Sequence, residues 1–428
     1  DLSEPITKDG NPVSCSATEK SPRIIIVGCG ASGIAAATRL IENGFDDITI
    51  LEAENRIGGR IHTTPFGGYL VDLGGQWVHG EEDNLSYEIA WPLGLLEHSA
   101  EEDPRQLLFD SAGSLLEENL GEELLDVLYD IAEDATSDSY SNKSMGESPV
   151  ICKTFSTSLQ KKYPDPTQEL PVLNRTVLNT EVTKIDYDFS GGDVRVTTVN
   201  GDEYSADHVI VTPSIGVLKA DYETLFDPPL PEAKINAIKL GTVVKIYLSY
   251  PEPWWTNEDD TDFNFFWREE DKSEYASNKS WMLGLLSVFP VEHKPRLLCA
   301  WVTGPHAREM DNIPDDRVFE QIKQFFRRFM GKTQALTEPT EMLRSKWLSN
   351  KHFRGAWSYR SLETESFGCR ILLDITRWEN GRFLLLFAGE ATHSKHPSTV
   401  HGAIGSGWRE ADRLIKLYAN RMSSMNAN

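Results

Sequence analysis

Three glycines directly follow an apolar run near the start of the chain, at a spacing that suits phosphate binding. Gly28 allows a tight turn, Gly30 lets the backbone approach a pyrophosphate, and Gly33 lets a following helix pack close to the strand. Residues 23–27 are almost wholly apolar, as a buried parallel strand requires, and residues 34–42 have the small and apolar side chains of a helix. The N–H groups and the dipole at the start of that helix would face the phosphates.

An acidic residue completes this unit. A second predicted strand over residues 47–51 ends at Glu52, whose carboxylate can accept hydrogen bonds from an adenosine ribose. The glycines alone are weak evidence, because an ordinary glycine-rich turn has the same spacing. Strand, turn, helix, second strand and acid within about 30 residues together predict a dinucleotide site.

The residues after Glu52 indicate which dinucleotide binds. Ala53 and Arg56 are followed by a glycine pair and by Arg60, a segment that a nicotinamide site does not need. This segment resembles the second half of the FAD fingerprint of the flavin amine oxidases. In that family the glycines approach the pyrophosphate and the arginine neutralises it.

Further motifs extend the resemblance from about residue 22 to about residue 420. Residues 74–80 are similar to the family segment that passes the flavin ring, and Val182 to the residue whose backbone holds the adenine. Residues 387–393 and 398–407 resemble the C-terminal fingerprint. The resemblance implies FAD contacts by Gly28, Gly30, Ser32, Gly33, Glu52, Ala53, Arg56, Gly59, Arg60, Gly75, Gln76, Trp77, Val182, Trp347, Gly389, Glu390, Ser398, Thr399 and Val400.

The C-terminal fingerprint also has a physical interpretation. Glu390 can accept hydrogen bonds from ribityl hydroxyls, and a helix that begins near Gly402 would direct its N-terminus at the pyrimidine edge of the flavin. A reduced flavin carries negative charge there, so the helix dipole would favour reduction. Without the resemblance, a surface carboxylate and an ordinary helix are the simpler interpretation.

Lys245 is the first candidate catalytic residue. It lies in a predicted strand, where alternation places it on the same face as Val243 and Tyr247. Pattern alone favours a solvent-facing lysine on an edge strand. The context, apolar alternation followed by proline and tryptophan, is similar to the family segment whose lysine reaches a water at flavin N5, and the resemblance therefore implies a catalytic role.

His79 is the second candidate, because the animal polyamine oxidases carry a histidine near the substrate amine in a similar Trp-Ile-His-Gly setting. A structural histidine in a turn is the alternative. The expected substrate contacts are His79, Glu81, Trp357, Tyr359 and Thr399. Glu81 with Glu82 would attract a cation, although a solvated acidic turn is the simpler interpretation. The stretch around Trp347 and Trp357 lacks the cysteine that monoamine oxidases bond to FAD, so a non-covalent FAD is expected.

The resemblance implies oxidation of a secondary amine of a polyamine such as spermine, an N-acetylated polyamine or spermidine. A hydride would pass to flavin N5, dioxygen would reoxidise the flavin to give hydrogen peroxide, and the imine would hydrolyse to an aldehyde and an amine. Two alternatives stay open. One is a flavin oxidase that acts on another amine, such as an amino acid or a peptidyl lysine, and the other is a non-catalytic flavoprotein with a reduced substrate domain.

Composition agrees with a small cationic substrate. The 428 residues carry 42 basic and 66 acidic side chains, a net charge of −24, which argues against nucleic acid and anionic lipid as partners. No apolar run is long enough to span a membrane. The five cysteines have no metal-ligand spacing, so no metal site is expected. Sequons are present at Asn84, Asn142, Asn174 and Asn278, but such triplets are frequent by chance. We therefore expect a reducing, cytoplasmic location, with a peroxisomal or secreted protein as alternatives. We expect dioxygen as the second substrate and a monomer or weak dimer.

The expected fold class is α/β (α+β overall), a Rossmann-like FAD-binding domain with a substrate domain of mixed sheet plus helices. The FAD domain is expected from residues 22–83, 173–245 and 378–420, and the substrate domain from 84–172 and 246–377, with a shortened region near 148–170. Residues 1–21 are predicted as a disordered tail and 421–428 as a second tail. Strands are predicted at 182–187, 194–199, 204–212, 242–250, 297–303 and 384–387, helices at 318–329 and 401–418, helical patterning over 84–140, and loop over 140–172.

Overall fold

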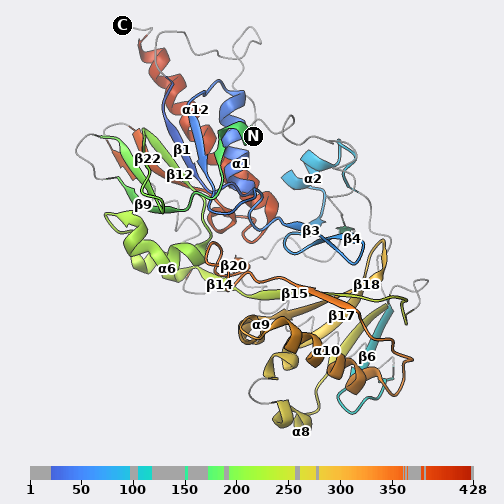
Figure 1. Ribbon diagram of the computed structural model, residues 1–428. Coiled ribbons are helices and arrows are strands. Elements are labelled where there is room, and N and C mark those ends of the chain that lie inside the picture. The colour runs from blue at the N-terminus through green and yellow to red at the C-terminus, as the bar shows by residue number, and fades with distance from the viewer. Residues whose placement is uncertain are drawn as a thin grey trace. The chain divides into compact units, whose positions relative to one another are not determined.

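The computed structural model describes residues 21–96, 105–117, 150–152, 172–187, 192–255, 261–275, 279–359, 361, 364, 377–379 and 382–425. These residues form two compact units (Figure 1). Unit 1 takes its residues from 1–62, 160–240 and 351–428, and unit 2 from 63–159 and 241–350. The chain thus changes from unit 1 to unit 2 after His62, whereas the expected FAD domain continued to residue 83. The assignment of FAD and substrate to particular ranges stays a prediction.

The main sheet of unit 1 has six strands in the order β21-β22-β12-β1-β2-β8. They are β1 (Ile24–Val27), β2 (Ile48–Leu51), β8 (Thr176–Val177), β12 (His208–Val211), β21 (Arg377–Glu379) and β22 (Arg382–Phe387). The five strands from β8 to β22 are parallel, and β21 is an antiparallel edge. Every residue of β1 is buried, which explains why this strand has an uninterrupted apolar sequence. The predicted α/β class and strand–turn–helix–strand unit are confirmed.

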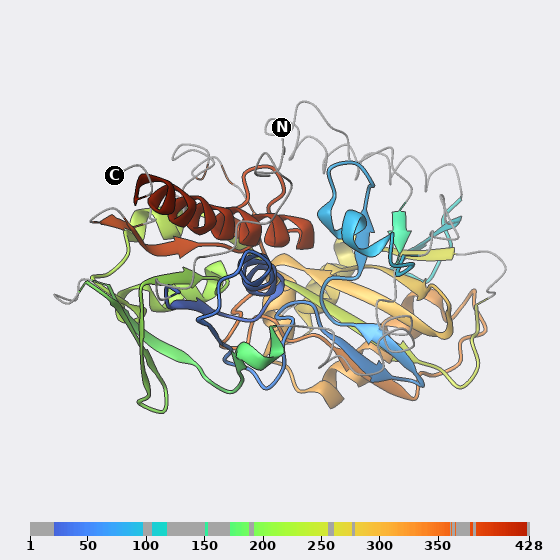
Figure 2. The same ribbon diagram turned by 90° about the horizontal axis from the view of Figure 1, so that it is seen from above.

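Helices cover this sheet. Helix α1 (Ala31–Glu42) follows the first glycine turn and packs against the long C-terminal helix α12 (Val400–Met425) (Figures 1 and 2). A second sheet of unit 1 has the order β11-β10-β9-β13. Its strands are β9 (Val182–Asp186), β10 (Val194–Thr198), β11 (Glu203–Ala206) and β13 (Phe226–Asp227). The remaining described elements of unit 1 are 3-10 helix η1 (Leu173–Arg175), α6 (Ile215–Leu225), α7 (Glu232–Ala237), β14 (Lys239–Gly241), β20 (Trp357–Tyr359) and 3-10 helix η5 (Glu390–Thr392).

Unit 2 contains a six-stranded sheet in the order β19-β15-β18-β17-β16-β6. Its strands are β6 (Arg105–Asp110), β15 (Val243–Ser249), β16 (Thr261–Phe266), β17 (Leu285–Val291), β18 (Lys294–Thr303) and β19 (Glu341–Arg344). Helix α10 (Asp315–Met330) packs its phenylalanines into the aromatic core on one face of this sheet. The other described elements are β3 (Thr63–Phe66), β4 (Tyr69–Asp72), β5 (Trp77–His79), α2 (Leu85–Ala90), β7 (Val150–Cys152), α8 (Glu269–Lys272), η2 (Ser273–Tyr275), η3 (Ser280–Gly284) and α9 (Gly304–Asp311).

Four sequence-based expectations about these elements were wrong. The strand predicted over 204–212 breaks at Asp207, which exchanges hydrogen bonds with Arg23, into β11 and β12 of two different sheets. Strand β6 lies in the region predicted to be helical, and it pairs with β16. Strand β7 lies in the predicted loop and pairs with β5. Helix α12 continues to Met425, into the expected tail. Residues 1–20 of the predicted disordered tail 1–21, and residues 118–140 of the predicted helical region, lie outside the described residues.

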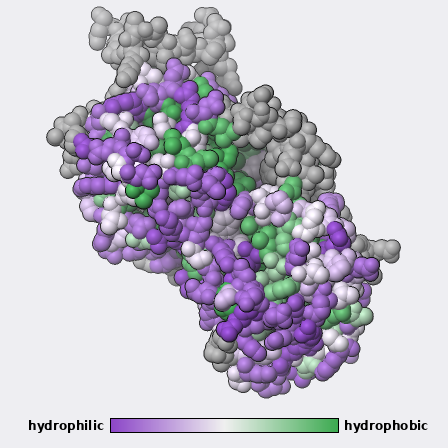
Figure 3. All heavy atoms as spheres, viewed as in Figure 1, coloured by the Kyte–Doolittle hydropathy of each residue, from purple (hydrophilic) through white to green (hydrophobic). Residues whose placement is uncertain are grey.

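The surface agrees with the acidic composition. Most of the face seen in Figure 3 is hydrophilic, as a net charge of −24 leads one to expect. Within the described part of the chain, no helix is both long and apolar enough to cross a membrane.

Candidate functional site

The turn between β1 and α1 is shaped by its glycines. A Cβ atom on Gly33 would lie 2.1 Å from the Gly28 carbonyl oxygen, so only glycine allows the helix to begin so close to the strand. Gly28 itself has a φ of +100°, a conformation that favours glycine. The N-cap of α1 is Gly30, and among the described residues no side chain caps this helix end. The first turn of α1 therefore offers its N–H groups to an anion.

Glu52 closes this turn from the end of β2. Its side chain is 6% exposed, and its two carboxylate oxygens accept hydrogen bonds from the backbone N–H groups of Cys29 (2.6 Å) and Glu54 (2.8 Å). A carboxylate can accept about four hydrogen bonds, so acceptor capacity is left for the two hydroxyls of a ribose. The backbone N–H of Thr180 donates to the Glu52 carbonyl, which brings the segment before Val182 to the same place.

The second glycine pair lies against the first turn. Gly58 forms a β-bridge with Gly30, and a Cβ atom on Gly59 would lie 3.2 Å from the Cα atom of Gly30. Two backbone segments without side chains thus meet at the start of α1, which leaves room for a bulky group such as a pyrophosphate. Arg56 does not face this space with a free charge, because its guanidinium is engaged by Glu54 at 2.8 Å.

Glu390 joins three distant segments of unit 1. One carboxylate oxygen accepts from the Arg60 guanidinium (2.9 Å) and the Ser358 backbone N–H (3.2 Å), and the other from the Ser358 hydroxyl (2.5 Å) and the Ser398 backbone N–H (2.9 Å). The residue is 5% exposed, so the interpretation as a surface carboxylate is wrong. Ser358 was missed by the sequence analysis, because nothing in its local pattern marks it as a partner of a residue 32 positions away.

The N-terminus of α12 follows directly. Val400 is its first residue, and the Thr399 hydroxyl accepts from the Gly402 N–H at 3.0 Å. A Cβ atom on Gly402 would lie 1.9 Å from the His396 carbonyl oxygen, so glycine is required for the tight start of this helix. The Gly389 N–H donates to the Ser406 hydroxyl at 2.8 Å, which ties the segment before Glu390 to the first turns of α12.

The groups at the start of α1 suit two parts of a dinucleotide such as FAD. An uncapped helix N-terminus beside two glycine turns suits a pyrophosphate, and Glu52 has acceptor capacity for a ribose. Of the nucleotide-binding residues predicted in unit 1, the fold brings two groups together. Gly28, Gly30, Gly33, Glu52 and Gly59 meet at the start of α1, and Arg60, Glu390 and Ser398 meet just before the start of α12.

Lys245 lies in the middle of a buried strand of unit 2. Strand β15 pairs with β19 on one side and β18 on the other, so it is not an edge strand, and Lys245 is 5% exposed. Its ammonium donates to the carbonyl oxygens of Asp72 (3.2 Å) and Gly74 (2.8 Å) and to the Gln76 side-chain oxygen (2.7 Å). The solvent-facing alternative is thereby excluded.

Two indole rings and a serine complete the surroundings of Lys245. The ammonium nitrogen lies 5.2 Å from the ring centroid of Trp77 and 5.3 Å from that of Trp301, which is within cation–π range. The Ser345 hydroxyl accepts the Lys245 backbone N–H at 2.9 Å. Trp301 is opposite Lys245 in the β15–β18 register, a pairing that the local sequence could not show.

Burial lowers the pKa of Lys245 to about 8, and the neighbouring Cys299 and Asp72 oppose this shift. Burial also raises the pKa of the Asp72 carboxyl, against the hydrogen bond from Thr63 and the charges of Lys245 and Lys294. A lysine with this pKa exists in both protonation states near neutral pH, which is a property of amines that take part in acid–base chemistry.

Other predicted residues have less defined surroundings. Trp347 donates its indole N–H to the Leu73 carbonyl at 3.0 Å, next to the segment that holds Lys245. The backbone of His79 is in β5, and its side chain lies outside the described residues. Glu81 is exposed in a turn, and Tyr359 at the end of β20 is 49% exposed. Trp357, Tyr359 and Thr399 belong to unit 1, and His79 and Glu81 to unit 2, so the predicted set of substrate contacts stays a prediction.

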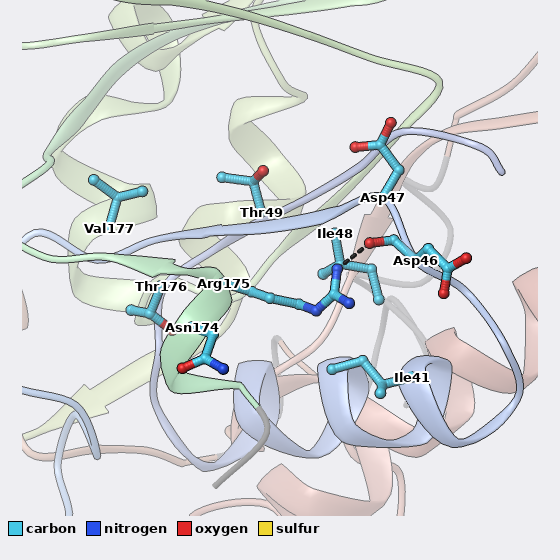
Figure 4. Close-up of a pocket in the computed structure, with 9 residues that line it drawn as sticks. All are labelled: Ile41, Asp46, Asp47, Ile48, Thr49, Asn174, Arg175, Thr176 and Val177. Carbon is cyan, nitrogen blue, oxygen red and sulfur yellow. Dashed lines mark hydrogen bonds between the residues drawn. The ribbon is translucent and has the colours of Figure 1, made fainter. Parts of the chain in front are cut away.

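A cavity of about 660 Å³ lies elsewhere, beside the edge strand β8. Figure 4 shows Arg175 directed towards the Asp46 carbonyl, and Asp47 and Val177 are among the residues that line the cavity. None of the predicted site residues lines this cavity.

Comparison with known proteins identifies the family. The profile of the family described as "Flavin containing amine oxidoreductase" matches residues 31–122 and 170–415. The chain belongs to this family. It is an FAD-dependent amine oxidase, and the predicted flavoprotein class is confirmed. The match leaves out residues 123–169, the stretch in which a shortened region is expected.

Several curated relatives match almost the whole chain. The peroxisomal N(1)-acetyl-spermine/spermidine oxidases of Homo sapiens and Bos taurus are 27% and 28% identical, over 93% of this chain and 96% of each relative. Polyamine oxidase 1 of Zea mays is 28% identical over 94% of this chain and 92% of its own. A solved structure of a redesigned putrescine oxidase has a TM-score of 0.66 at 18% identity and covers 92% of this chain and 99% of that one, which supports the fold.

Proposed function

We propose that this amine oxidase acts on a polyamine, which it oxidises at a secondary amine to give an aldehyde, an amine and hydrogen peroxide. The observation that carries this proposal is that relatives named as oxidases of acetylated or free polyamines match over nine tenths of both chains. FAD, when bound, supplies the oxidation, since it takes two electrons from the amine and gives them to dioxygen. The net charge of −24 supports attraction of a polycation.

The residues of unit 1 would hold the cofactor. We propose that the first turn of α1 binds the pyrophosphate and that Glu52 binds the adenosine ribose. Glu390 fixes Arg60, Ser358 and Ser398 with four hydrogen bonds, so its carboxylate acts chiefly as an anchor of these three segments. Since the sequence lacks the linkage cysteine near Trp347 and Trp357, we propose a non-covalent FAD.

Lys245 is the proposed catalytic residue of unit 2, and His79 the proposed contact of the substrate amine. In the described structure the three N–H donors of Lys245 have three oxygen acceptors. To hold a water, the ammonium has to release one of these oxygens. Lys245→Met keeps the apolar stem and removes all three donors.

Peroxide release from a panel of amines tests the substrate class. Spermine, N-acetylspermine and spermidine are compared with free lysine and a lysine-containing peptide. We expect one polyamine to exceed lysine and the peptide by about tenfold or more in kcat/KM, the scale on which a fitted site discriminates. Peroxide from lysine or the peptide alone would replace the proposal with the other amine class. No peroxide from any amine would overturn it.

Stopped-flow absorbance tests the role of Lys245. Lys245→Met should retain FAD but slow flavin reduction or reoxidation by about 10²-fold, the scale for loss of one positioned polar group. Lys416→Met is the matched control, because Lys416 is exposed on α12. If the rates of flavin reduction and reoxidation in Lys245→Met are both within about threefold of those of the control, the effect is far smaller than about 10²-fold. The proposed catalytic role of Lys245 would then be wrong.

A further inference from the structure

Tyr247 faces the same oxygens as Lys245. It lies two residues further along β15 and is fully buried in a small core of unit 2 that is separate from the large aromatic core. Its hydroxyl donates to the Asp72 carbonyl at 2.8 Å and lies 3.2 Å from the Gln76 side-chain oxygen. Both oxygens are also acceptors of Lys245.

The donors of Lys245 and Tyr247 outnumber the oxygen atoms that accept from them. The ammonium has three N–H donors and the phenol has one O–H. The oxygens that face them are three: the carbonyls of Asp72 and Gly74 and the side chain of Gln76. Because each oxygen can accept two hydrogen bonds, the oxygens of Asp72 and Gln76 each face two donors, and either oxygen can lose one donor and keep the other.

We propose that Tyr247 is a positioning residue that lets Lys245 turn one N–H towards an outside acceptor such as water. When the ammonium releases the Asp72 or the Gln76 oxygen, the phenol serves that oxygen instead, so no buried oxygen loses its donor. Without the phenol, three donors serve three oxygens, and each release leaves one buried acceptor without a partner. The proposal rests on the proposed role of Lys245.

Lys245 determines the orientation of Gln76. Its ammonium can only donate, so the oxygen of the amide, and not its nitrogen, has to face it, and the Tyr247 hydroxyl approaches the same oxygen. The amide nitrogen of Gln76 consequently faces away from Lys245, and it donates to no protein acceptor in the part of the chain that the structure describes. This places a second set of donors on the segment that resembles the family motif near the flavin.

The charged groups around Lys245 come from several elements. Asp72 at the end of β4 carries a carboxyl that accepts from Thr63 on β3 at 2.5 Å. Lys294 and Cys299 on β18 are the other titratable neighbours of this cluster. Tyr247 contributes no charge near neutral pH, because burial raises the pKa of its phenol. Its effect on Lys245 is therefore exerted through the shared acceptors.

The test uses the holoenzyme and the variant Tyr247→Phe, with Tyr250→Phe as the matched control. Tyr250 is equally buried just after β15, but it belongs to the large aromatic core. The first readout is the Lys245 pKa, which is measured by an NMR titration of protein labelled with carbon-13 at the lysine ε-carbon. The Lys245 signal is assigned by its absence from the spectrum of Lys245→Met. In Tyr247→Phe the ammonium becomes the sole donor to the shared oxygens, so its pKa should rise by about 0.5 to 1, the scale of one hydrogen bond. Tyr250→Phe should leave it unchanged.

The second readout is flavin reoxidation by dioxygen after reduction with dithionite, which requires no amine substrate. If Lys245→Met slows reoxidation, Tyr247→Phe should slow it by about tenfold, because each release of an oxygen then leaves a buried acceptor alone. The double variant should be no slower than Lys245→Met alone, since residues that act as a unit are not additive.

The outcomes separate this proposal from the substrate assignment. If no polyamine gives peroxide but Tyr247→Phe still shifts the Lys245 pKa, only the proposed substrate class is refuted. If Tyr247→Phe matches Tyr250→Phe in Lys245 pKa, the positioning role is wrong. Gln76→Met gives an independent check if Tyr247→Phe does not fold, because loss of an acceptor should lower the Lys245 pKa. An unchanged or raised value in Gln76→Met would overturn the proposal.

Discussion

Replacing Lys245 should change the pH dependence of stability in a defined direction. Burial lowers the Lys245 pKa from 10.5 to about 8. The free energy of protonating this amine is therefore less favourable by about 3 kcal/mol in the folded chain than in the unfolded chain. Between these two pH values the unfolded chain binds more protons than the folded chain, so rising pH favours the folded state. Below pH 8 the folded protein carries the full cost of a buried charge, and above pH 10.5 it carries none.

Lys245→Met removes this cost together with three hydrogen bonds. The single O–H of Tyr247 is then shared between the oxygens of Asp72 and Gln76, so the Gly74 carbonyl is the one left with no donor, at about 1–3 kcal/mol. At pH 7 the two effects nearly cancel, and variant and parent should be similarly stable. At pH 9.5 deprotonation of Lys245 has relieved about 2 kcal/mol of this cost in the parent. The variant should then be less stable than the parent by about that amount.

Urea unfolding of parent and variant at pH 7.0, 8.0, 9.0 and 9.5, followed by tryptophan fluorescence, measures this difference. The comparison cancels every other titrating group, because both proteins share them. Lys416→Met, at an exposed lysine of α12, should show a difference that does not depend on pH. If the difference in unfolding free energy between Lys245→Met and the parent stays constant within about 0.5 kcal/mol over this range, folding does not perturb the Lys245 pKa. That result would refute the burial of the Lys245 ammonium among the oxygens of Asp72, Gly74 and Gln76.

Three further predictions concern unit 1. Glu52→Gln should weaken FAD retention on dilution by about tenfold or more, because a charge-assisted hydrogen bond contributes about 1.5–3 kcal/mol, whereas Glu42→Gln on the exposed end of α1 should not. Gly407→Ala should destabilise the protein to heat by about 1–3 kcal/mol, because its Cβ atom would lie 2.2 Å from the Ser32 carbonyl oxygen of α1. Acid precipitation should leave the flavin in the supernatant, and a yellow pellet would contradict non-covalent binding.

The nucleotide-binding turn could be predicted from sequence because its information is local. The apolar strand, the glycine spacing and the terminal Glu52 lie within one short stretch, and each residue type follows from a steric or hydrogen-bonding need there. The structure confirms the predicted strands and helix, and it adds the register, with Ile24 opposite Ile48 in the β1–β2 pair. The same local pattern could not place β12, whose limits depend on the ion pair of Asp207 with Arg23.

The surroundings of Lys245 could not be predicted, because they depend on strand order. An alternating strand with one lysine is compatible with an edge or with the centre of a sheet. The deciding partners, β18 and β19, lie roughly 50 to 100 residues further along the chain, and they cover both sides of β15. Alternation correctly placed Tyr247 on the lysine face, but only the paired strands show that this face is buried against Asp72 and Gln76.

Glu390 and Lys245 are buried charges that do not contact an equally buried group of opposite charge. Glu390 accepts four hydrogen bonds, of which only the one from Arg60 comes from a charged group, and Lys245 donates three to neutral oxygens. The donors to Glu390 come from three segments of the chain and the acceptors of Lys245 from one, residues 72–76, so each charge orders those segments as it is satisfied. Because a buried charge whose partners are removed costs several kcal/mol, the segments cannot separate while the charge stays inside. Hydrophobic side chains of equal volume would stabilise the fold at least as well. A buried charge beside a segment that resembles a flavin-binding motif agrees with the role proposed for Lys245, and the pH dependence of the stability of Lys245→Met measures how strongly folding perturbs this charge.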